Sequence, residues 1–516
     1  MAVNQSKPVK KKGILNFIEK VGNALPHPAT IFVILCGIIM VVSHVMAKMG
    51  VSVTYDALNM TTNQIEATTV TVKSLISSEG IVAMLEGALK NFTSFAPLGT
   101  VLVAMLGVGV AEGTGLIGTA LKKLVISTPK TLITLVVVLA GVLSSIASDA
   151  GYVVLIPLGA IVFLSMGRHP MAGLAAAFAG VSGGFSANLM FGPTDALLAG
   201  ISTEAAKIQS ATAGVEVTDN WFFLIASTFL IAIIGTLVTE KIVEPRLGEY
   251  KGDAKVDQNI NLNPTEKKGL KFAGIASIFV VIVLVIATIP QNAILRNAET
   301  GSLVDKSPLM NSIVVIIAIV FLILGVAYGI GAGSIKNDKD IIKEMGKTMS
   351  TMGGYIVLVF FAAQFVQYFA QSNVGTVIAV KGADFLKAAN IGGIPLILGF
   401  ILVTAFVNLF MGSASAKWAI MAPIFIPMLM EMGFAPEFTQ MAYRIGDSST
   451  NIISPLMTYF ALIVSFAEKY DKESGIGTMI STMVPYSISF LLGWSALLIV
   501  WMMLNLPLGP GASIMM

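Results

Sequence analysis

The chain has 516 residues, of which 55% are hydrophobic and only 12% are charged. Soluble globular proteins usually carry about 25% charged residues, so this composition excludes that class and indicates a chain that crosses a lipid bilayer several times. The net charge is only +3 and the lysines gather in loops, so nucleic acid is not an expected partner. Cys36 is the lone cysteine, which excludes an intrachain disulfide.

Apolar passages recur along the whole chain. They lie at about 29–47, 98–121, 131–148, 152–166, 171–190, 221–242, 269–290, 309–332, 350–371, 392–410, 415–430, 436–464 and 481–506. The residues before them, 1–28, form a basic tail that the positive-inside rule places in the cytoplasm. Successive crossings from there put the basic clusters, such as Lys122-Lys123 and Arg168-His169, on the cytoplasmic side, as the rule requires.

The chain contains two copies of one unit. A constant offset places Tyr152 on Trp418, Pro157 on Pro423, Met166-Gly167 on Met432-Gly433 and Pro170 on Pro436, and after a short gap Ser186-Ala187-Asn188 falls on Ser449-Thr450-Asn451. Small and polar residues also line ordinary helix contacts in membranes, so a single match would mean little. Several matched landmarks in a row favour a repeat.

The passages before residue 243 and those after residue 308 cross the membrane in opposite directions. Secondary transporters use such an inverted repeat to build a site at the middle of the bilayer. We therefore divide the chain into a first repeat at 29–243, a middle segment at 244–308, a second repeat at 309–507 and an outer tail at 508–516. The middle segment is expected to hold a cytoplasmic loop, a connector helix and an outer loop.

Two stretches, at about 131–166 and 392–430, have short apolar arms around a tip of small and polar residues. Non-helical backbone at membrane depth is tolerated where it lines a watery cavity, so each stretch is predicted to be a re-entrant hairpin. Asp149 and Lys417 lie at the two tips, where either could reach water. The predicted fold class is an all-α polytopic membrane protein, an inverted-repeat secondary transporter with nine transmembrane helices and two re-entrant helical hairpins.

The segment from Asn408 to Tyr459 holds the densest set of polar residues in apolar surroundings. A charge at the centre of a membrane helix costs about 2.5–3.5 kcal/mol on insertion scales, so Arg444 and Asp447 indicate a functional site. Their i,i+3 spacing places them on one helix face, where they can pair. The alternative to a functional site is an ion pair that only locks the helix bundle.

The helix that carries these charges is predicted to open beside them. Gly446 begins a small and polar run that ends at Asn451, and Pro455 follows. An opened helix exposes carbonyls that hold a cation and a helix N-terminus that holds a carboxylate. At the equivalent break of the first repeat Asn188 precedes Asp195, whose alternative role is that of an ordinary residue at the outer boundary.

An intramembrane hydrolase and an ion channel are the alternative function classes. Gly180-Val181-Ser182-Gly183 matches the short serine motif of rhomboid proteases, but every histidine of this chain precedes Ser182, whereas in that family the partner histidine follows. Gly346-Lys347-Thr348 has Ile341 where a nucleotide-binding loop needs its first glycine. An inverted repeat with interrupted helices, and with an arginine close to acidic residues, favours a transporter with alternating access over a channel. We therefore predict a transporter and not an enzyme.

The polar segment also resembles a known family. Its pattern of Ser413, Ser415, Trp418, Pro436, Arg444, Asp447 and Pro455, together with the length and hydropathy of the chain, is similar to the AbgT (p-aminobenzoyl-glutamate transporter) family. The resemblance implies a homodimer in a bacterial inner membrane. It also implies transport of the folate catabolite p-aminobenzoyl-glutamate, or export of sulfonamide antimetabolites, driven by a proton or sodium gradient.

The resemblance implies a site as well. Its members would be Asp195, Asn408, Ser415, Trp418, Arg444, Asp447 and Pro455, and Asn188, Ser413 and Asn451 complete the substrate-binding set that we predict. The chemistry suits an aromatic-amide carboxylate. Trp418 offers an aromatic face for the substrate ring, and the planar guanidinium of Arg444 can bind a carboxylate through two N–H groups.

The coupling ion is the one further ligand that the sequence suggests, and no other cofactor is expected. Asp447, Asn451 and Asn408 offer the oxygen ligands that sodium prefers. Asp447 could carry a proton instead, and the positive charge of Arg444 one turn away slightly favours sodium.

Overall fold

The computed structural model describes residues 26–59, 64–147, 151–252, 261–304, 307–455, 457 and 459–516. Most of the basic tail at 1–28 and Asp149 at the first hairpin tip lie outside the described residues. The described residues are mostly helical, and their two strands, β1 (Ser52–Asn59) and β2 (Gln64–Thr71), form one antiparallel ribbon.

Seven helices among the described residues are long and apolar enough to cross a membrane. They are α2 (Pro28–Lys48), α3 with α4 (Ser78–Gly113), α10 with α11 (Trp221–Leu247), α12 (Pro264–Thr288), α14 (Ile313–Ala332), α16 (Gly353–Gln371) and α22 (Ile476–Met503). An eighth span results if α5 (Leu116–Ile126) is counted with Lys130–Ile146, which includes α6 (Ile133–Leu143), although the two are bent by 114°. Apolar side chains such as Ile278 and Phe279 on α12 are exposed, as lipid-facing residues are.

Two further helices are interrupted. In the first repeat α8 (Pro170–Phe178) continues into a π-helical turn at Ala179–Gly183, loses helical structure and resumes as α9 (Pro193–Ala206). In the second repeat α20 (Pro436–Asn451) is followed by an irregular segment and by α21 (Phe460–Ala467). The chain reaches nine crossings only if both interrupted helices are counted, so the nine-span count stays a prediction.

The break in α20 does not lie where the sequence placed it. The helix was expected to open between Gly446 and Asn451, but it continues to Asn451 and ends there. The polar run remains helical, and its hydroxyls find hydrogen-bond partners within the helix. Ser449 donates to the Ile445 carbonyl at 2.6 Å and Thr450 to the Gly446 carbonyl at 2.8 Å. The expected position of the opening was therefore wrong by several residues.

The two predicted hairpins consist of short helices. The first contains α6, a 3-10 turn at Ser144–Ala147, a π-helical turn at Gly151–Leu155 and α7 (Ile156–Ser165). The second contains α18 (Gly393–Asn408) and α19 (Ala414–Met430). A full crossing needs about 20 helical residues, so each arm is too short to span a bilayer alone. Whether both arms enter from one side stays a prediction.

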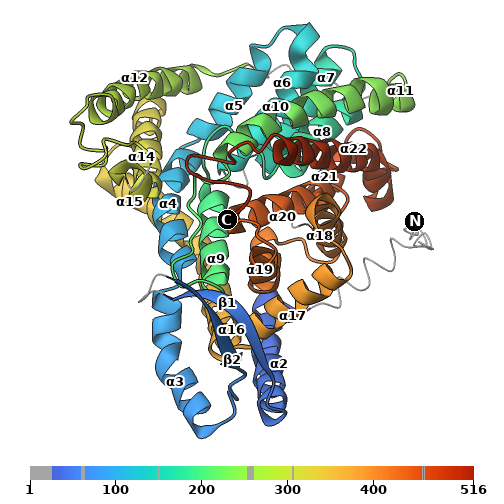
Figure 1. Ribbon diagram of the computed structural model, residues 1–516. Helices are drawn as coiled ribbons and strands as arrows, with labels where there is room; N and C mark the ends of the chain where they lie inside the picture. Colours follow the sequence, from blue (N-terminus) through green and yellow to red (C-terminus); the bar gives the residue numbers. More distant parts are fainter. Residues whose placement is uncertain are drawn as a thin grey trace, which may run out of the picture.

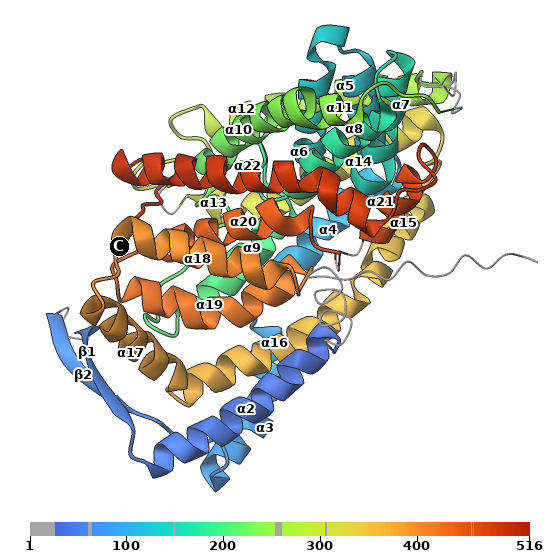
Figure 2. The ribbon, with the colours of Figure 1, turned by 90° about the vertical axis from the view of Figure 1, so that its right-hand side faces the viewer.

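The helices of the second hairpin lie at the centre of the molecule. Figure 2 shows α18, α19 and α20, in orange, next to one another between α22 and α16, and α20 contacts α18, α19, α22 and α9. In Figure 1 α9, α19 and α20 meet in the same central region. The blue ribbon of β1 and β2 lies at one end of Figure 2 and α5 with α7 at the other. Because α20 is buried on all sides, its polar residues lie at the centre of the protein.

Several shorter elements complete the fold. They are α13 (Pro308–Asn311), α15 (Asp338–Thr351) and α17 (Val374–Ala388). The expected outer tail folds back as a strap, because the Ala435 amide donates to the Ile514 carbonyl at 2.9 Å and the Phe223 amide to the Leu508 carbonyl at 3.1 Å. The strap thereby ties the turn before α20 to the start of α10.

Candidate substrate and ion site

Four charged side chains meet at the centre of the bundle, and α20 supplies two of them. Arg444 and Asp447 are 2% and 1% exposed. The Arg444 guanidinium donates through Nη2 to Asp195 Oδ1 at 2.7 Å, and the other Asp195 oxygen accepts the Gly192 amide at 2.7 Å. Asp195 therefore lies in the centre at the start of α9 and not at the outer boundary.

The second ion pair joins the tip of the second hairpin to α20. Lys417, in the first turn of α19, pairs through Nζ with Asp447 Oδ1. Its side chain is 0% exposed, so the expectation that Lys417 could reach water was wrong. The alternative in which Arg444 pairs with Asp447 is not what the structure shows, because α9 and α19 each bring a partner of opposite charge to α20.

Asn408 connects this pair to the end of α20. Its Nδ2 group donates to the Asp447 carbonyl at 2.7 Å, and Asn451 Oδ1 lies 2.9 Å away. Its Oδ1 atom accepts a hydrogen bond from Lys417. The three residues predicted to bind sodium are thus brought together, but the Lys417 ammonium lies among them and takes two of their oxygens.

Three polar atoms on one face of α20 are buried without a hydrogen-bond partner. They are Arg444 Nε, Asp447 Oδ2 and Ser448 Oγ. Positions i, i+3 and i+4 lie next to one another on a helix, so these atoms form a single surface. Buried polar atoms are nearly always satisfied in native proteins, so a group of three points to a place where a ligand supplies the missing bonds.

Aromatic rings flank the charges. Trp418 stacks on Tyr443 with 4.3 Å between ring centroids, and both side chains are fully buried. The Trp418 indole donates to Ser202 Oγ at 3.0 Å, and the Tyr443 hydroxyl donates to the Ala414 carbonyl at 2.6 Å. Sequence reasoning missed Ser202 as a member of this centre. Its position two helical turns after Asp195, on the same face of α9, is the signal that could have identified it.

The remaining predicted residues lie at the edges of the centre. Asn188 donates to Ser145 Oγ at 2.9 Å and so contacts the first hairpin, not the four charges. Ser413 caps α19 through the Ala416 amide, and its hydroxyl lies 3.4 Å from that of Ser415. Pro455 lies in the irregular segment after α20 and is partly buried.

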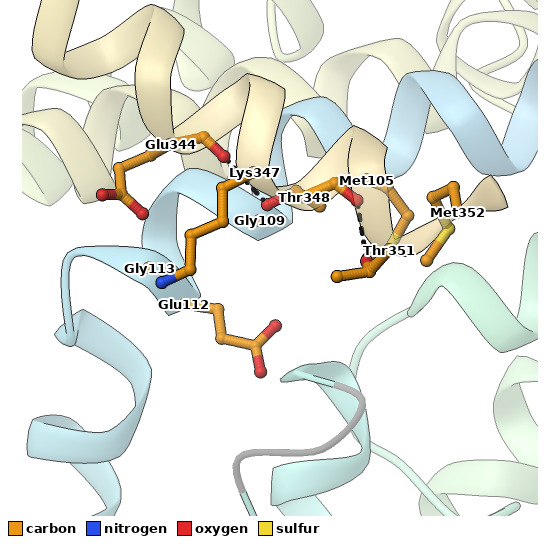
Figure 3. Close-up of a pocket in the computed structure, with 9 residues that line it drawn as sticks. All are labelled: Met105, Gly109, Glu112, Gly113, Glu344, Lys347, Thr348, Thr351 and Met352. Carbon is orange, nitrogen blue, oxygen red and sulfur yellow. Dashed lines mark hydrogen bonds between the residues drawn. The ribbon is translucent and has the colours of Figure 1, made fainter.

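A separate cavity of about 360 Å³ lies between α4 and α15. Figure 3 shows Glu344 and Lys347 of α15 on one side of it and Glu112 of α4 on the other. Glu344 Oε2 is buried there without a partner. Glu112 therefore lines a cavity. The helix α4 also contacts the 3-10 turn at Ser144–Ala147 in the first hairpin.

The described residues contain no group of three or more histidine, cysteine or acidic side chains that could hold a metal ion. The centre holds two ion pairs, an aromatic stack and three buried polar atoms without a hydrogen-bond partner. Such a set can bind an organic anion that also carries a hydrogen-bond donor.

Comparisons with known proteins agree with this architecture. A model of the AbgT putative transporter family matches residues 13–516. A p-aminobenzoyl-glutamate transport protein of Escherichia coli (strain K12) is 39% identical over 499 residues, which is 96% of each chain. The solved Alcanivorax borkumensis YdaH transporter is 47% identical, with a TM-score of 0.87 over 94% of this chain and 100% of its own. MtrF of Neisseria gonorrhoeae, from a class of antimetabolite efflux pumps, is 49% identical, with a TM-score of 0.91 over 97% of this chain and 100% of its own.

Proposed function

Because this chain belongs to the AbgT family of transporters, we propose that it moves p-aminobenzoyl-glutamate and related aromatic-amide carboxylates across the membrane and exports sulfonamide antimetabolites. The family consists of membrane transporters for small molecules, which removes the hydrolase and channel alternatives. The name of the Escherichia coli relative suggests the first substrate class, and the description of the Neisseria relative suggests the second.

The surface of three unpaired polar atoms on α20 supports this proposal most directly. Arg444 Nε is a donor fit for a carboxylate, and Asp447 Oδ2 is an acceptor fit for an amine. A p-aminobenzoyl-glutamate molecule carries both groups, joined by an aromatic ring that suits the neighbouring Trp418–Tyr443 stack. Sulfonamide antimetabolites share the p-aminophenyl group, so the same acceptor and aromatic stack would serve both classes.

Asp195 gives the site a way to open and close. Its carboxylate pairs with Arg444 as a substrate carboxylate would. A substrate that binds Arg444 would displace Asp195 and free α9, which begins directly after the irregular segment of the first repeat. Binding would thus loosen the contact between the two repeats, which is what alternating access requires.

The remaining features of the proposal follow from the same architecture. A proton or sodium gradient drives the transport, and the protein acts as a homodimer in the bacterial inner membrane with a cytoplasmic N-terminus. The exposed apolar faces of α12 and α14 are available to lipid or to a second subunit.

Counterflow in proteoliposomes tests the proposed function. Purified protein is reconstituted with internal unlabelled p-aminobenzoyl-glutamate, and uptake of the labelled compound is followed at several sodium concentrations and pH values. We expect transient accumulation that unlabelled sulfonamide reduces by competition. The absence of counterflow, with folded protein in the vesicles, would contradict the proposed substrate class.

A further inference from the structure

The cavity between α4 and α15 is lined by one face of each helix. The lining residues are Met105, Gly109, Glu112 and Gly113 of α4, and Glu344, Lys347, Thr348 and Thr351 of α15 with Met352, which follows it. Their spacing along each helix places them on a single face. None of them belongs to the four-charge centre on α20, so the cavity is a separate candidate site.

The cavity has a charged end and an apolar end. A Cβ atom on Gly113 would lie 2.3 Å from Glu344 Oε2, and a Cβ atom on Gly109 would lie 2.3 Å from Thr348 Oγ1. The two helices therefore run in opposite directions, which places the methionine of each lining face at the end away from the carboxylates. Methionine side chains are flexible and polarizable, so they can pack around an apolar group of variable shape.

The charged end carries more negative than positive charge. Glu344 Oε2 is buried there without a hydrogen-bond partner, and Figure 3 shows Glu112 on the opposite side of the cavity. The C-terminus of α4, at Gly113, adds the negative end of the helix dipole. Lys347 is the one basic residue among the lining residues, and its side chain is exposed to solvent. A buried carboxylate oxygen without a donor is unfavourable, so a cationic donor would stabilise this end.

We propose that this cavity binds an organic ammonium ion that carries an apolar body. The ammonium group donates to Glu344 Oε2 and lies near the negative charge of Glu112, while the apolar body packs against the two methionines. The cavity volume of about 360 Å³ lies within the range of small-molecule sites, about 300–1,000 Å³. A soluble amphiphilic amine and the ammonium headgroup of a membrane lipid share this chemistry.

Isothermal titration calorimetry with phenylbutylammonium chloride tests this site on the purified protein in phosphatidylcholine nanodiscs, with empty nanodiscs as the blank. We expect saturable binding by wild type and no saturable binding of the neutral analogue phenylbutanol, which lacks the charge. Glu344→Gln should weaken binding about tenfold or more, because it removes a charge-assisted hydrogen bond. Glu473→Gln removes an exposed carboxylate outside the cavity and should behave as wild type.

Lys347→Met should change the affinity in the opposite direction. The lysine repels a bound ammonium group, so its removal should tighten binding about two- to fivefold, the scale of exposed charge interactions. This variant also carries the test if Glu344→Gln does not fold. No saturable binding by wild type, equal affinity in folded Glu344→Gln, or weaker binding in Lys347→Met would overturn the proposal.

Nanodiscs of phosphatidylethanolamine distinguish the two sources of the ammonium group. Its headgroup carries N–H donors that the phosphatidylcholine headgroup lacks. A soluble amine as the natural ligand predicts equal affinity for phenylbutylammonium in the two lipids, which is the result we expect. Weaker binding in phosphatidylethanolamine would assign the cavity to the lipid headgroup. None of these titrations contains a transport substrate, so a failure of the proposed function leaves their outcome unaffected.

Discussion

Asp447 shows how strongly a single residue of this protein depends on its partner. Its carboxylate is the counter-charge of the fully buried Lys417 ammonium. A buried ion pair contributes little net stability over an apolar pair, but the loss of one member leaves the other charge buried and alone. The geometry of the pair therefore makes a sharp prediction about stability, separate from transport.

Asp447→Asn should lower the free energy of unfolding by about 3–5 kcal/mol, the usual cost of breaking a buried pair from one side. The double variant Lys417→Met/Asp447→Asn should recover much of that loss, because it removes the stranded cation. Thermal or denaturant unfolding of the purified proteins measures both. A double variant less stable than Asp447→Asn would show that the ammonium is not the destabilising group.

At this scale the sequence identified most of the residues but not their partners. Arg444, Asp447, Asn408 and Asp195 were named, and the structure brings them together with Trp418. Local spacing suggested that Arg444 pairs with Asp447, yet each finds its partner on another helix. Sequence spacing reports neighbours within one helix and contains no information on which distant helix packs beside it.

At the scale of elements, α20 owes its position to the absence of a side chain at Gly446. A Cβ atom there would lie 2.5 Å from the Ile401 carbonyl oxygen of α18. The close approach lets Asn408 at the end of α18 reach the Asp447 carbonyl at 2.7 Å. The contact between α18 and α20 thus positions the hairpin tip against the site.

Gly446→Ala should destabilise the protein by about 1–3 kcal/mol, the usual cost of overpacking, although alanine is the better helix former. Gly399→Ala in α18 is the matched control, since nothing lies within 4 Å of its added Cβ. Melting temperatures of the two variants provide the comparison. Equal melting temperatures of the two variants would mean that α18 and α20 can move apart without loss of stability.

The C-terminal strap makes a second prediction at this scale. Burial, with smaller contributions from Glu437 and Glu216, raises the pKa of Asp219 to about 7 from an ordinary value of 3.8. A raised carboxyl pKa means that folding favours the protonated form, so stability is highest below the ordinary pKa and falls as pH rises through the folded value. Asp219 lies beneath the strap, where a Cβ atom on Gly509 would lie 2.6 Å from its carbonyl carbon.

Asp219→Asn should therefore reduce the decline in melting temperature between pH 3.8 and about pH 7, because asparagine does not titrate. Glu299→Gln, at an exposed carboxylate in the loop after α12, should leave the wild-type profile unchanged. Melting curves across that pH range give the result. An unaltered profile in Asp219→Asn would assign the pH dependence to another group.

The sequence predicted the helices that hydropathy defines. It did not predict helix ends that depend on hydrogen bonds of individual side chains. The apolar passages correspond to helices such as α12, α14 and α22. The end of α20 was misplaced because Ser449 and Thr450, read as helix breakers, bond to their own helix instead. The β1–β2 ribbon was missed because a short amphipathic ribbon has no hydropathy signal comparable to that of a membrane span.

At the scale of the whole molecule, orientation in the membrane remains a prediction of the charge pattern. Lysines and arginines cluster at one set of loops, which the positive-inside rule places in the cytoplasm. Ser334 follows α14 on that side, and Ala298 lies in the loop between α12 and α13 on the other; both are exposed.

Single cysteines at these positions, in a Cys36→Ser background, test the orientation. A membrane-impermeant maleimide applied to intact spheroplasts should label Ala298→Cys and spare Ser334→Cys until the membrane is opened. The reverse pattern would invert the assignment of every loop.

The whole-molecule account depends on one claim, that Arg444 binds the substrate carboxylate at the centre of the two repeats. Counterflow of p-aminobenzoyl-glutamate by wild type, Arg444→Ala and Arg246→Ala tests it most directly, since Arg246 is an exposed arginine outside the centre. We predict that Arg444→Ala loses counterflow while it remains folded in the membrane, and that Arg246→Ala retains it. Undiminished counterflow in Arg444→Ala would contradict the account.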